Sequence, residues 1–550
     1  MNEATITAHL IDLHQRRTYP ARITVSDGRI AAIEEIAEAP ARYILPGFID
    51  AHVHIESSML SPAAFGRAAL RHGTIATVSD PHEIANVCGM AGVEWMLENA
   101  RHTPLKIFFG APSCVPATPF ETAGATLDSG AVAALLSRPD IWYLTEVMNY
   151  PGVLNGDAEV MAKIAAANAA GKPIDGHAPG LRGHDALRYA QAGISTDHEC
   201  TTLPEALDKI AAGMHILIRE GSAAKNFDAL HPLLSLHPGR AMLCSDDKHP
   251  DDLERGHIDQ LAARAIALGH DRYDVLRAAC INPALHYGLP IGLLRVGDPA
   301  DFIVVEDLDF FAVLETWIDG QCVYQKGSAE PYTTAPATPI NHFHCLPVHT
   351  SDFSIPCSTE SPVDVAVIEA MDGQLLTRRG HARLAVVQGI VQPSPNDDVL
   401  KIAVVNRYQP GVRPATAFIK GFGLKHGAIA ASVAHDCHNI LAVGCDDESI
   451  ATAVNAVIAM QGGLAVASAG QALARLPLPI AGLMSSADCE TVAAQYQHAD
   501  RTAKDLGSTL SAPFMTLSFM ALLVIPALKL SDQGLFDGEA FRFVPVVEES

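Results

Sequence analysis

Short apolar runs alternate with alanine-rich amphipathic segments between about residues 47 and 291. Segment 157–171, for example, has the spacing of apolar residues that an amphipathic helix requires. Eight strands alternating with helices predict an α/β fold, a (β/α)8 TIM-like barrel over 47–291. A doubly wound open sheet would show the same alternation, but eight repeats favour closure, and no glycine-rich dinucleotide fingerprint follows the first run. The apolar runs begin at Gly47, Gly73, Leu105, Ile141, Pro173, Ile194, His215 and Ala241.

Strand-like sequences also lie on both sides of this region. Alternating apolar positions flank two Asp-Gly pairs, at 27–28 and 319–320, and such pairs are typical of two-residue hairpins. Neither set of strands is large enough to bury a face by itself. We therefore expect residues 1–46 and 292–340 to join into one small, discontinuous, sandwich-like β-sheet domain.

The pattern changes again after about residue 340. Segment 341–356 is irregular and proline-rich, and the strand-like runs after it lead into an alanine- and glycine-rich region, which predicts an additional C-terminal α/β domain over 345–550. Within it, 514–530 is almost long enough and apolar enough to span a bilayer. Because Thr516, Pro526 and Lys529 interrupt it, we interpret it as a buried core strand followed by a helix.

Composition and charge narrow the class of protein. Acidic residues outnumber basic ones by 62 to 38, so the net charge is −24, which repels phosphates and argues against a nucleic-acid or anionic-membrane partner. Hydrophobic residues make up 49% of the chain, enough for a large core. The 11 cysteines form no C-x-x-C, which argues against a disulfide framework and a thiolate zinc site. With no export signal at the start, a cytoplasmic protein is expected.

Histidines and carboxylates fall where the predicted strands end. In a barrel, side chains at the carboxyl ends of the strands converge on one mouth. His52 and His54 lie two apart on one strand and so point the same way. Four imidazoles and two carboxylates suit Zn, Mn or Fe(II) better than Mg or Ca, and two metals sharing a carboxylate would use all six. The candidate metal ligands are His52, His54, Glu146, His177, His198 and Asp246.

Several longer motifs make the sequence recognisable. Segment 43–57, YILPGFIDAHVHIES, resembles the first-strand signature of the amidohydrolase superfamily, and 282–307 is similar to its closing segment. Within the superfamily, the motifs SDPHEIANV, TEVMNYPGV and SDDKHP are closer to those of the adenine deaminase family. Segment 421–447 is similar to that family's additional domain, so the resemblance covers essentially the whole chain.

The resemblance implies hydrolytic deamination of adenine to hypoxanthine and ammonia in purine salvage, with a metal-bridging hydroxide attacking purine C6 at a two-metal centre of Mn or Fe(II), Zn being possible. Many superfamily members bridge their metals with a carboxylated lysine from the fourth strand, a position that Glu146 occupies in this chain. The superfamily pattern assigns His52, His54 and Asp246 to one metal. It assigns His177 and His198 to the other, with Glu146 bridging.

The reaction also needs proton transfers. Asp246 is the candidate shuttle between the attacking oxygen and the leaving amino group, and protonation of ring N1 is open among Glu83, His82 and Glu56. Asp80 ends the second strand and, with Glu56 and Arg219, is a candidate substrate contact, although the D-P-H-E sequence also suits a simple turn.

Some polar residues have a structural interpretation as well as a functional one. Arg219 and Glu220 are predicted to form an ion pair, and Asp247 either orients a ligand or faces solvent. His435 and His438 lie in the C-terminal region, where they could bind a third metal or act at the active site or its closure; we favour the second role.

Two other functions compete with deamination of adenine. One is hydrolysis of a cyclic amide by a hydantoinase- or dihydroorotase-like amidohydrolase, although such enzymes are expected to carry the strand-four lysine. The other is a non-catalytic barrel scaffold, although scaffolds typically lose metal ligands. The expected partners are a purine base and water, with no nucleic acid or membrane, and a homo-oligomer, most simply a dimer.

Overall fold

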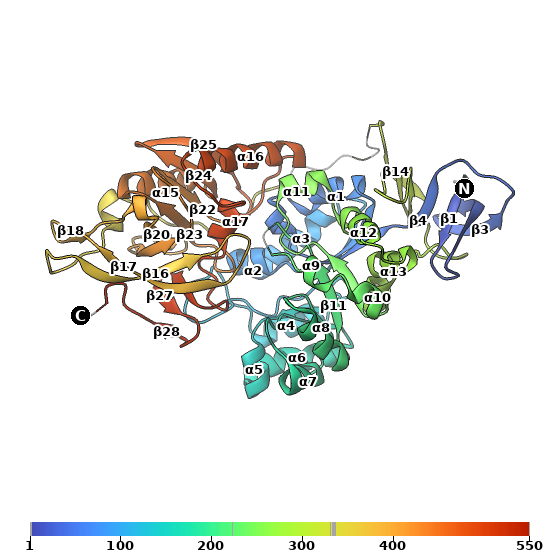
Figure 1. The fold of residues 1–550 in the computed structure, drawn as a ribbon. Coiled ribbons are helices and arrows are strands. Elements are labelled where there is room, and N and C mark those ends of the chain that lie inside the picture. Colours follow the sequence, from blue (N-terminus) through green and yellow to red (C-terminus); the bar gives the residue numbers. More distant parts are fainter. Residues whose placement is uncertain (1–2, 223, 330–331, 333–336, 549–550) are drawn as a thin grey trace.

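The computed structural model describes residues 3–222, 224–329, 332 and 337–548. Figure 1 shows three parts in a row. A β-sheet with the N-terminus lies at one end, a mixed helix-and-strand region lies in the centre, and a second mixed region with the C-terminus lies at the other end.

All eight apolar runs of the central region form strands. Parallel pairing joins consecutive strands in three groups, β5–β6–β7, β8–β9 and β10–β11–β12. A parallel bridge between Ala111 and Leu144 connects β7 to β8, and Ser195 N–H donates to Ile174 O between β9 and β10. A bridge from Val53 to Asp246 brings the last strand beside the first. The strands are β5 Phe48–Val53, β6 Thr74–Ser79, β7 Lys106–Phe109, β8 Leu144–Val147, β9 Ile174–Gly176, β10 Thr196–Asp197, β11 His215–Arg219 and β12 Ala241–Cys244.

Helices separate these strands. Several begin where a side-chain oxygen accepts a hydrogen bond from a backbone N–H of the first turn, as Ser61, Asp128, Asp157 and Thr202 do. The helices are α1 Pro62–Arg71, α2 His82–Cys88, α3 Met90–Ala100, α4 Ser129–Leu136, α5 Tyr150–Asn155, α6 Ala158–Ala170, α7 Gly183–Gln191, α8 Leu203–Ala211, α9 Phe227–Leu230, α10 Leu233–Leu236, α11 Pro250–Arg255, α12 Ile258–Ala267, α13 Arg272–Leu276 and α14 Asn282–His286, with single turns η1 Ile55–Ser58 and η2 Arg277–Ile281.

Strands from before and after the central region pair in one seven-stranded sheet, in the order β15–β14–β13–β4–β1–β2–β3. Both Asp-Gly pairs form the predicted hairpin turns: φ is +50° and +79° at 27–28, and +47° and +75° at 319–320. The strands are β1 Glu3–Asp12, β2 Arg17–Ser26, β3 Arg29–Glu35, β4 Tyr43–Pro46, β13 Phe302–Val305, β14 Val313–Ile318 and β15 Gln321–Gln325.

The C-terminal region is built on an eight-stranded sheet in the order β17–β16–β21–β20–β23–β22–β24–β25. Successive residues of β23 belong to different cores: Ile440 and Ala442 pack with α15 (Asp447–Ala459), and Leu441 and Val443 belong to the cluster that continues into the central region. The strands are β16 Val363–Ala370, β17 Thr377–Leu384, β20 Leu400–Val405, β21 Ala415–Lys420, β22 Ala428–Ala431, β23 Ile440–Gly444, β24 Gly463–Ser468 and β25 Gln471–Pro477.

The apolar segment 514–530 differs from its prediction. A helix comes first, α17 Pro513–Ser518, and a strand follows, β26 Leu528–Ser531, so the predicted order is wrong. Pro513 at the first helical position explains the start, because proline fits there. Over the described residues, no helix combines the length and apolar character needed to span a bilayer. The remaining elements are η3 Thr350–Phe353, β18 Val386–Val387, β19 Ile390–Val391, η4 Pro395–Asp397, α16 Cys489–Asp505, β27 Gly534–Asp537 and β28 Arg542–Phe543.

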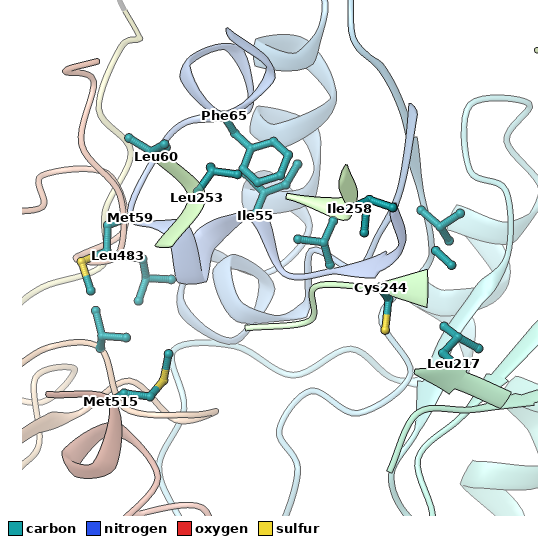
Figure 2. Close-up of a cluster of buried hydrophobic side chains, with 14 of the residues drawn as sticks. Ile55, Met59, Leu60, Phe65, Leu217, Cys244, Leu253, Ile258, Leu483 and Met515 are labelled. Carbon is teal, nitrogen blue, oxygen red and sulfur yellow. The ribbon is translucent and has the colours of Figure 1, made fainter. Parts of the chain in front are cut away.

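One buried apolar cluster joins the central and C-terminal regions. All four of Met59, Leu60, Leu483 and Met515 belong to this cluster, and Figure 2 shows Met59 beside Leu483, which comes from the C-terminal region as Met515 does. A backbone hydrogen bond also joins the two regions, because Ser485 N–H donates to Met59 O at 2.8 Å. The two regions therefore share a core, and this core holds the C-terminal region beside η1 and α1.

Candidate metal centre and active site

The predicted histidine and carboxylate ligands lie together at the carboxyl ends of the central strands. The Nε2 atoms of His52 and His54 are 3.1 Å apart, and Asp246 Oδ1 is 3.3 Å from His54 Nε2 and 3.7 Å from His52 Nε2. All three side chains are buried. The bridge between β5 and β12 explains their proximity, because Asp246 N–H donates to His52 O at 2.9 Å.

Glu146 lies between two groups of histidines. Its Oε1 is 3.2 Å from His54 Nε2, whereas its Oε2 is 2.5 Å from His177 Nδ1 and 3.1 Å from His198 Nε2. Burial alone would raise the pKa of this carboxyl, but His177 and His198 hold it well below its usual range. A carboxylate with one oxygen toward each group has the geometry of a bridging ligand.

These donors form compact groups that could hold divalent ions. In each group, one nitrogen or oxygen per residue lies within 4.8 Å of the others, and all the residues are buried. The donor set of imidazoles and carboxylates fits a divalent transition metal. The groups include His52–His54–Asp246, His52–Glu146–His198 and His177–His198–Glu199.

Arg219 neutralises the carboxylates beside this centre. It donates from Nη1 to Asp246 Oδ2 at 2.6 Å and makes two hydrogen bonds to Glu199. The predicted ion pair with Glu220 is wrong, because Glu220 bonds Arg264 at 3.0 Å, and successive strand residues point to opposite faces. The sequence interpretation also missed Glu199, although it directly follows His198 and so could have been considered a strand-end carboxylate.

The D-P-H-E segment forms the start of α2. Asp80 accepts from His82 at both its backbone N–H (3.0 Å) and its Nδ1 (2.9 Å), and so fixes that ring. Glu56 accepts from Ile84 N–H at 3.1 Å, and burial raises the pKa of its carboxyl to about 7. His82 and Glu83 line the cavity at this centre. Asp80 and Glu56 are not among the described residues that line it.

The C-terminal region closes the other side of this cavity. His435 and His438 contact the two oxygens of Glu83, and Asp436 Oδ1 is 3.6 Å from His82 Nε2. Asp247, buried on the cavity wall, accepts from Ser57 Oγ at 2.5 Å. The apolar part of the wall is formed by Met148, Leu375, Phe519 and Leu522. Three of these four are in the C-terminal region, and the sequence pattern did not indicate them because apolar residues there also suit a core.

Comparisons with known proteins agree with these features. The amidohydrolase family model matches residues 43–323, and the model of the adenine deaminase C-terminal domain matches 374–542. Proteins named adenine deaminase from Salinibacter ruber and a Sulfurovum species are each 55% identical over 98% of this chain and 98% of theirs. One from Methanosarcina acetivorans is 50% identical over 98% of this chain and 99% of its own. The chain therefore belongs to the amidohydrolase family and, within it, to the group of the adenine deaminases.

Proposed function

We propose that this protein hydrolyses adenine to hypoxanthine and ammonia. The observation that carries the proposal is a cavity shared by groups that could hold metal ions and two carboxylates, Asp246 and Glu83, in a chain with near full-length similarity to proteins named adenine deaminase. A planar base needs both polar and apolar contacts, and the wall offers both kinds.

The proposed metal ligands are the six residues predicted from the strand ends. His52, His54 and Asp246 would hold one ion, His177 and His198 the other, and Glu146 would bridge them. When bound, such ions lower the pKa of a coordinated water from about 15.7 toward 7 and so supply a nucleophile at neutral pH. Manganese or Fe(II) is the proposed occupant, with zinc also compatible with the donors.

Two carboxylates would move the protons. Water brings two protons, and the products need one on ring N1 and one on the departing nitrogen. Burial alone would raise the pKa of the Glu83 carboxyl, but His435 and His438 hold it well below its usual range, so this carboxylate would first take a proton from the water and then deliver it to N1. Asp246 would take the second from the oxygen added at C6 and give it to the amino group, so that the C6–N bond breaks with ammonia as the leaving group.

Arg219 would hold Asp246 ready for this role. Burial alone would raise the pKa of the Asp246 carboxyl, but Arg219, together with the hydrogen bond to His54, keeps it well below its usual range. The carboxylate is then ionised and able to accept a proton. This interpretation changes Arg219 from a substrate contact to a residue that acts through Asp246.

The proposal extends to architecture and setting. Residues 47–291 would form a closed (β/α)8 barrel, 1–46 with 292–340 the small sheet domain, and 345–550 the C-terminal domain. We also propose a cytoplasmic homodimer. The net charge of −24 supports the further proposal that it binds no nucleic acid or anionic membrane. Light scattering coupled to size-exclusion chromatography tests the dimer.

Metal analysis paired with ammonia release tests the function. Protein stripped with a chelator and reloaded with Mn²⁺ or Fe(II) is expected to release ammonia from adenine, with two ions bound per chain, and the stripped protein is expected to be inactive. The same preparation is assayed on hydantoin and dihydroorotate. Fully loaded protein that leaves adenine unchanged would overturn the proposal, and turnover of a cyclic amide instead would favour the alternative.

A further inference from the structure

Two imidazoles from the C-terminal region hold one carboxylate of the central region. Glu83 lies in the first turn of α2, and its Oε1 and Oε2 contact His435 Nδ1 and His438 Nε2, respectively. All three side chains are at least 97% buried, so these contacts are not competed for by bulk water. More than 350 residues separate Glu83 from His438 in the sequence.

The backbone fixes the tautomer of His438. Ala434 N–H points at His438 Nδ1 over 3.1 Å, so Nδ1 accepts and carries no hydrogen when the ring is neutral. The hydrogen is then on Nε2, which donates it to Glu83 Oε2. Burial lowers the pKa of His438, which favours the neutral ring. His438 is therefore a fixed donor toward one oxygen of Glu83.

The other oxygen of Glu83, Oε1, contacts His435 instead. His435 lies on the cavity wall, where its ring stacks on Phe519 with centroids 4.5 Å apart and an interplanar angle of 16°. Its backbone N–H donates to Ser518 O at 3.0 Å. Neighbouring C-terminal residues thus hold both imidazoles in place, and Oε1 of Glu83 is the oxygen that contacts a residue of the cavity wall, His435.

We propose that His438 is a positioning residue for deamination: by donating to Oε2 of Glu83, it leaves Oε1, the oxygen next to the cavity-wall residue His435, as the one that transfers the proton. In that transfer, Oε1 first takes a proton from the attacking water, and the Oε1–H bond then breaks as the N1–H bond of the purine forms. The inference rests on the proposed function, because it assumes that Glu83 acts on the ring. It also gives the C-terminal region a defined part in catalysis.

Substitutions of His438 test this role. His438→Met has similar bulk but no donor, and we expect its kcat on adenine to fall ~10- to 100-fold with KM changed much less. His438→Gln retains an N–H at the end of the side chain and is expected to recover most of the loss. Exposed His498 on α16 supplies the matched control, His498→Met, which should be unchanged.

A double-mutant cycle separates positioning from general damage. In a Glu83→Gln background, His438→Met is expected to lower kcat no further, because the group that it positions is already gone. An equal loss in both backgrounds, or no loss in the single variant, would overturn the inference while leaving the proposed function intact. Wild-type protein that is inactive on adenine would overturn both. If His438→Met proves unstable in thermal melts, the same cycle is run with His438→Leu, which also lacks the donor and whose loss should likewise vanish with Glu83→Gln.

Discussion

Asp246 combines an unusual backbone conformation with a crowded set of charged neighbours. Its φ is +54°, in the left-handed region that non-glycine residues rarely adopt. This conformation comes two residues after the end of β12 and places the carboxylate near His54 on one side and Arg219 on the other. Rare backbone conformations of this kind persist where the surrounding structure fixes them, and they are concentrated at functional sites.

Replacing this carboxylate tests its role as the proton shuttle. Asp246→Asn keeps the size of the side chain but removes the base, and we expect kcat on adenine to fall at least ~10²-fold with a smaller change in KM. Steady-state ammonia release measures both, with metal content determined in parallel. Asp208→Asn, at a partly exposed carboxylate on α8, is the control. Near-normal turnover of Asp246→Asn would remove Asp246 from the mechanism.

Arg219 is expected to matter for stability as well as for chemistry. Arg219→Met leaves Glu199 and Asp246 buried without their shared cation, and removal of one partner from such a group costs about 3–5 kcal/mol. Arg219→Lys, which retains the charge but not the forked donor, should lose less. Denaturation of metal-free protein compares the two variants. Equal stability of wild type and Arg219→Met would show that the charges are compensated elsewhere.

For single residues, the sequence was a better guide to which metal-ligand candidates lie together than to which other side chains contact them. His52 lies near the end of one apolar run and Asp246 just after another. A parallel arrangement of these strands is therefore enough to bring the two side chains together. The partners of Arg219 could not be predicted in the same way, because they depend on which side of each strand faces the cavity. The contacts of Glu83 with His435 and His438 depend on how a distant region packs, which local patterns do not encode.

Among the elements, the hairpins were easiest to predict and the segment 514–530 hardest. The Asp-Gly pairs at 27–28 and 319–320 fix their turns locally through positive φ. Segment 514–530 is buried except for half-buried Val524, Pro526 and Ala527, so it has no polar face whose period would distinguish a helix from a strand. The end of the segment is fixed by Lys529 on β26, whose contacts include Leu375, a residue distant in the sequence.

Lys529 ties together the two segments that supply the apolar wall of the cavity. Its Nζ donates to Leu375 O at 2.7 Å and to Phe519 O at 2.9 Å, and the side chain is fully buried. Burial lowers the pKa of this amine to about 7. A neutral amine still has two hydrogens for the two carbonyls, so the link persists in either protonation state.

This buried amine should produce a pH-dependent stability. The unfolded chain keeps the Lys529 proton up to about pH 10.5, whereas the folded protein releases it near pH 7. Between these values the unfolded state binds more protons, so stability rises with pH by up to about 1.4 kcal/mol per unit. Lys529→Met lacks this group, and melting curves from pH 6 to 9 should show wild type gaining stability relative to the variant. A constant difference across that range would contradict the lowered pKa.

For the whole molecule, the shared core explains why the candidate active-site cavity can draw on two distant parts of the chain. Cys489 begins α16, and its Sγ contacts Pro250 O of α11 at 3.4 Å. Arg71 of α1 pairs with Glu490, the next residue of α16. These contacts and the apolar cluster in Figure 2 lie on the same side of the central region as η1 and α1. The position of His438 relative to Glu83 therefore depends on packing well outside the cavity.

A substitution in that junction should consequently affect both stability and turnover. Leu483 is 1% exposed and packs near Met59 and Met515, so Leu483→Ala is expected to cost about 2–5 kcal/mol in unfolding free energy. Leu473→Ala removes the same atoms from a side chain that is 44% exposed and should stay within about 0.5 kcal/mol of wild type. Because the junction also sets how the C-terminal histidines meet Glu83, kcat on adenine should fall in the first variant alone. Thermal melts and ammonia release on the same samples measure both effects. A destabilised Leu483→Ala protein with full kcat would mean that the catalytic contacts between the regions are held locally, without help from this core.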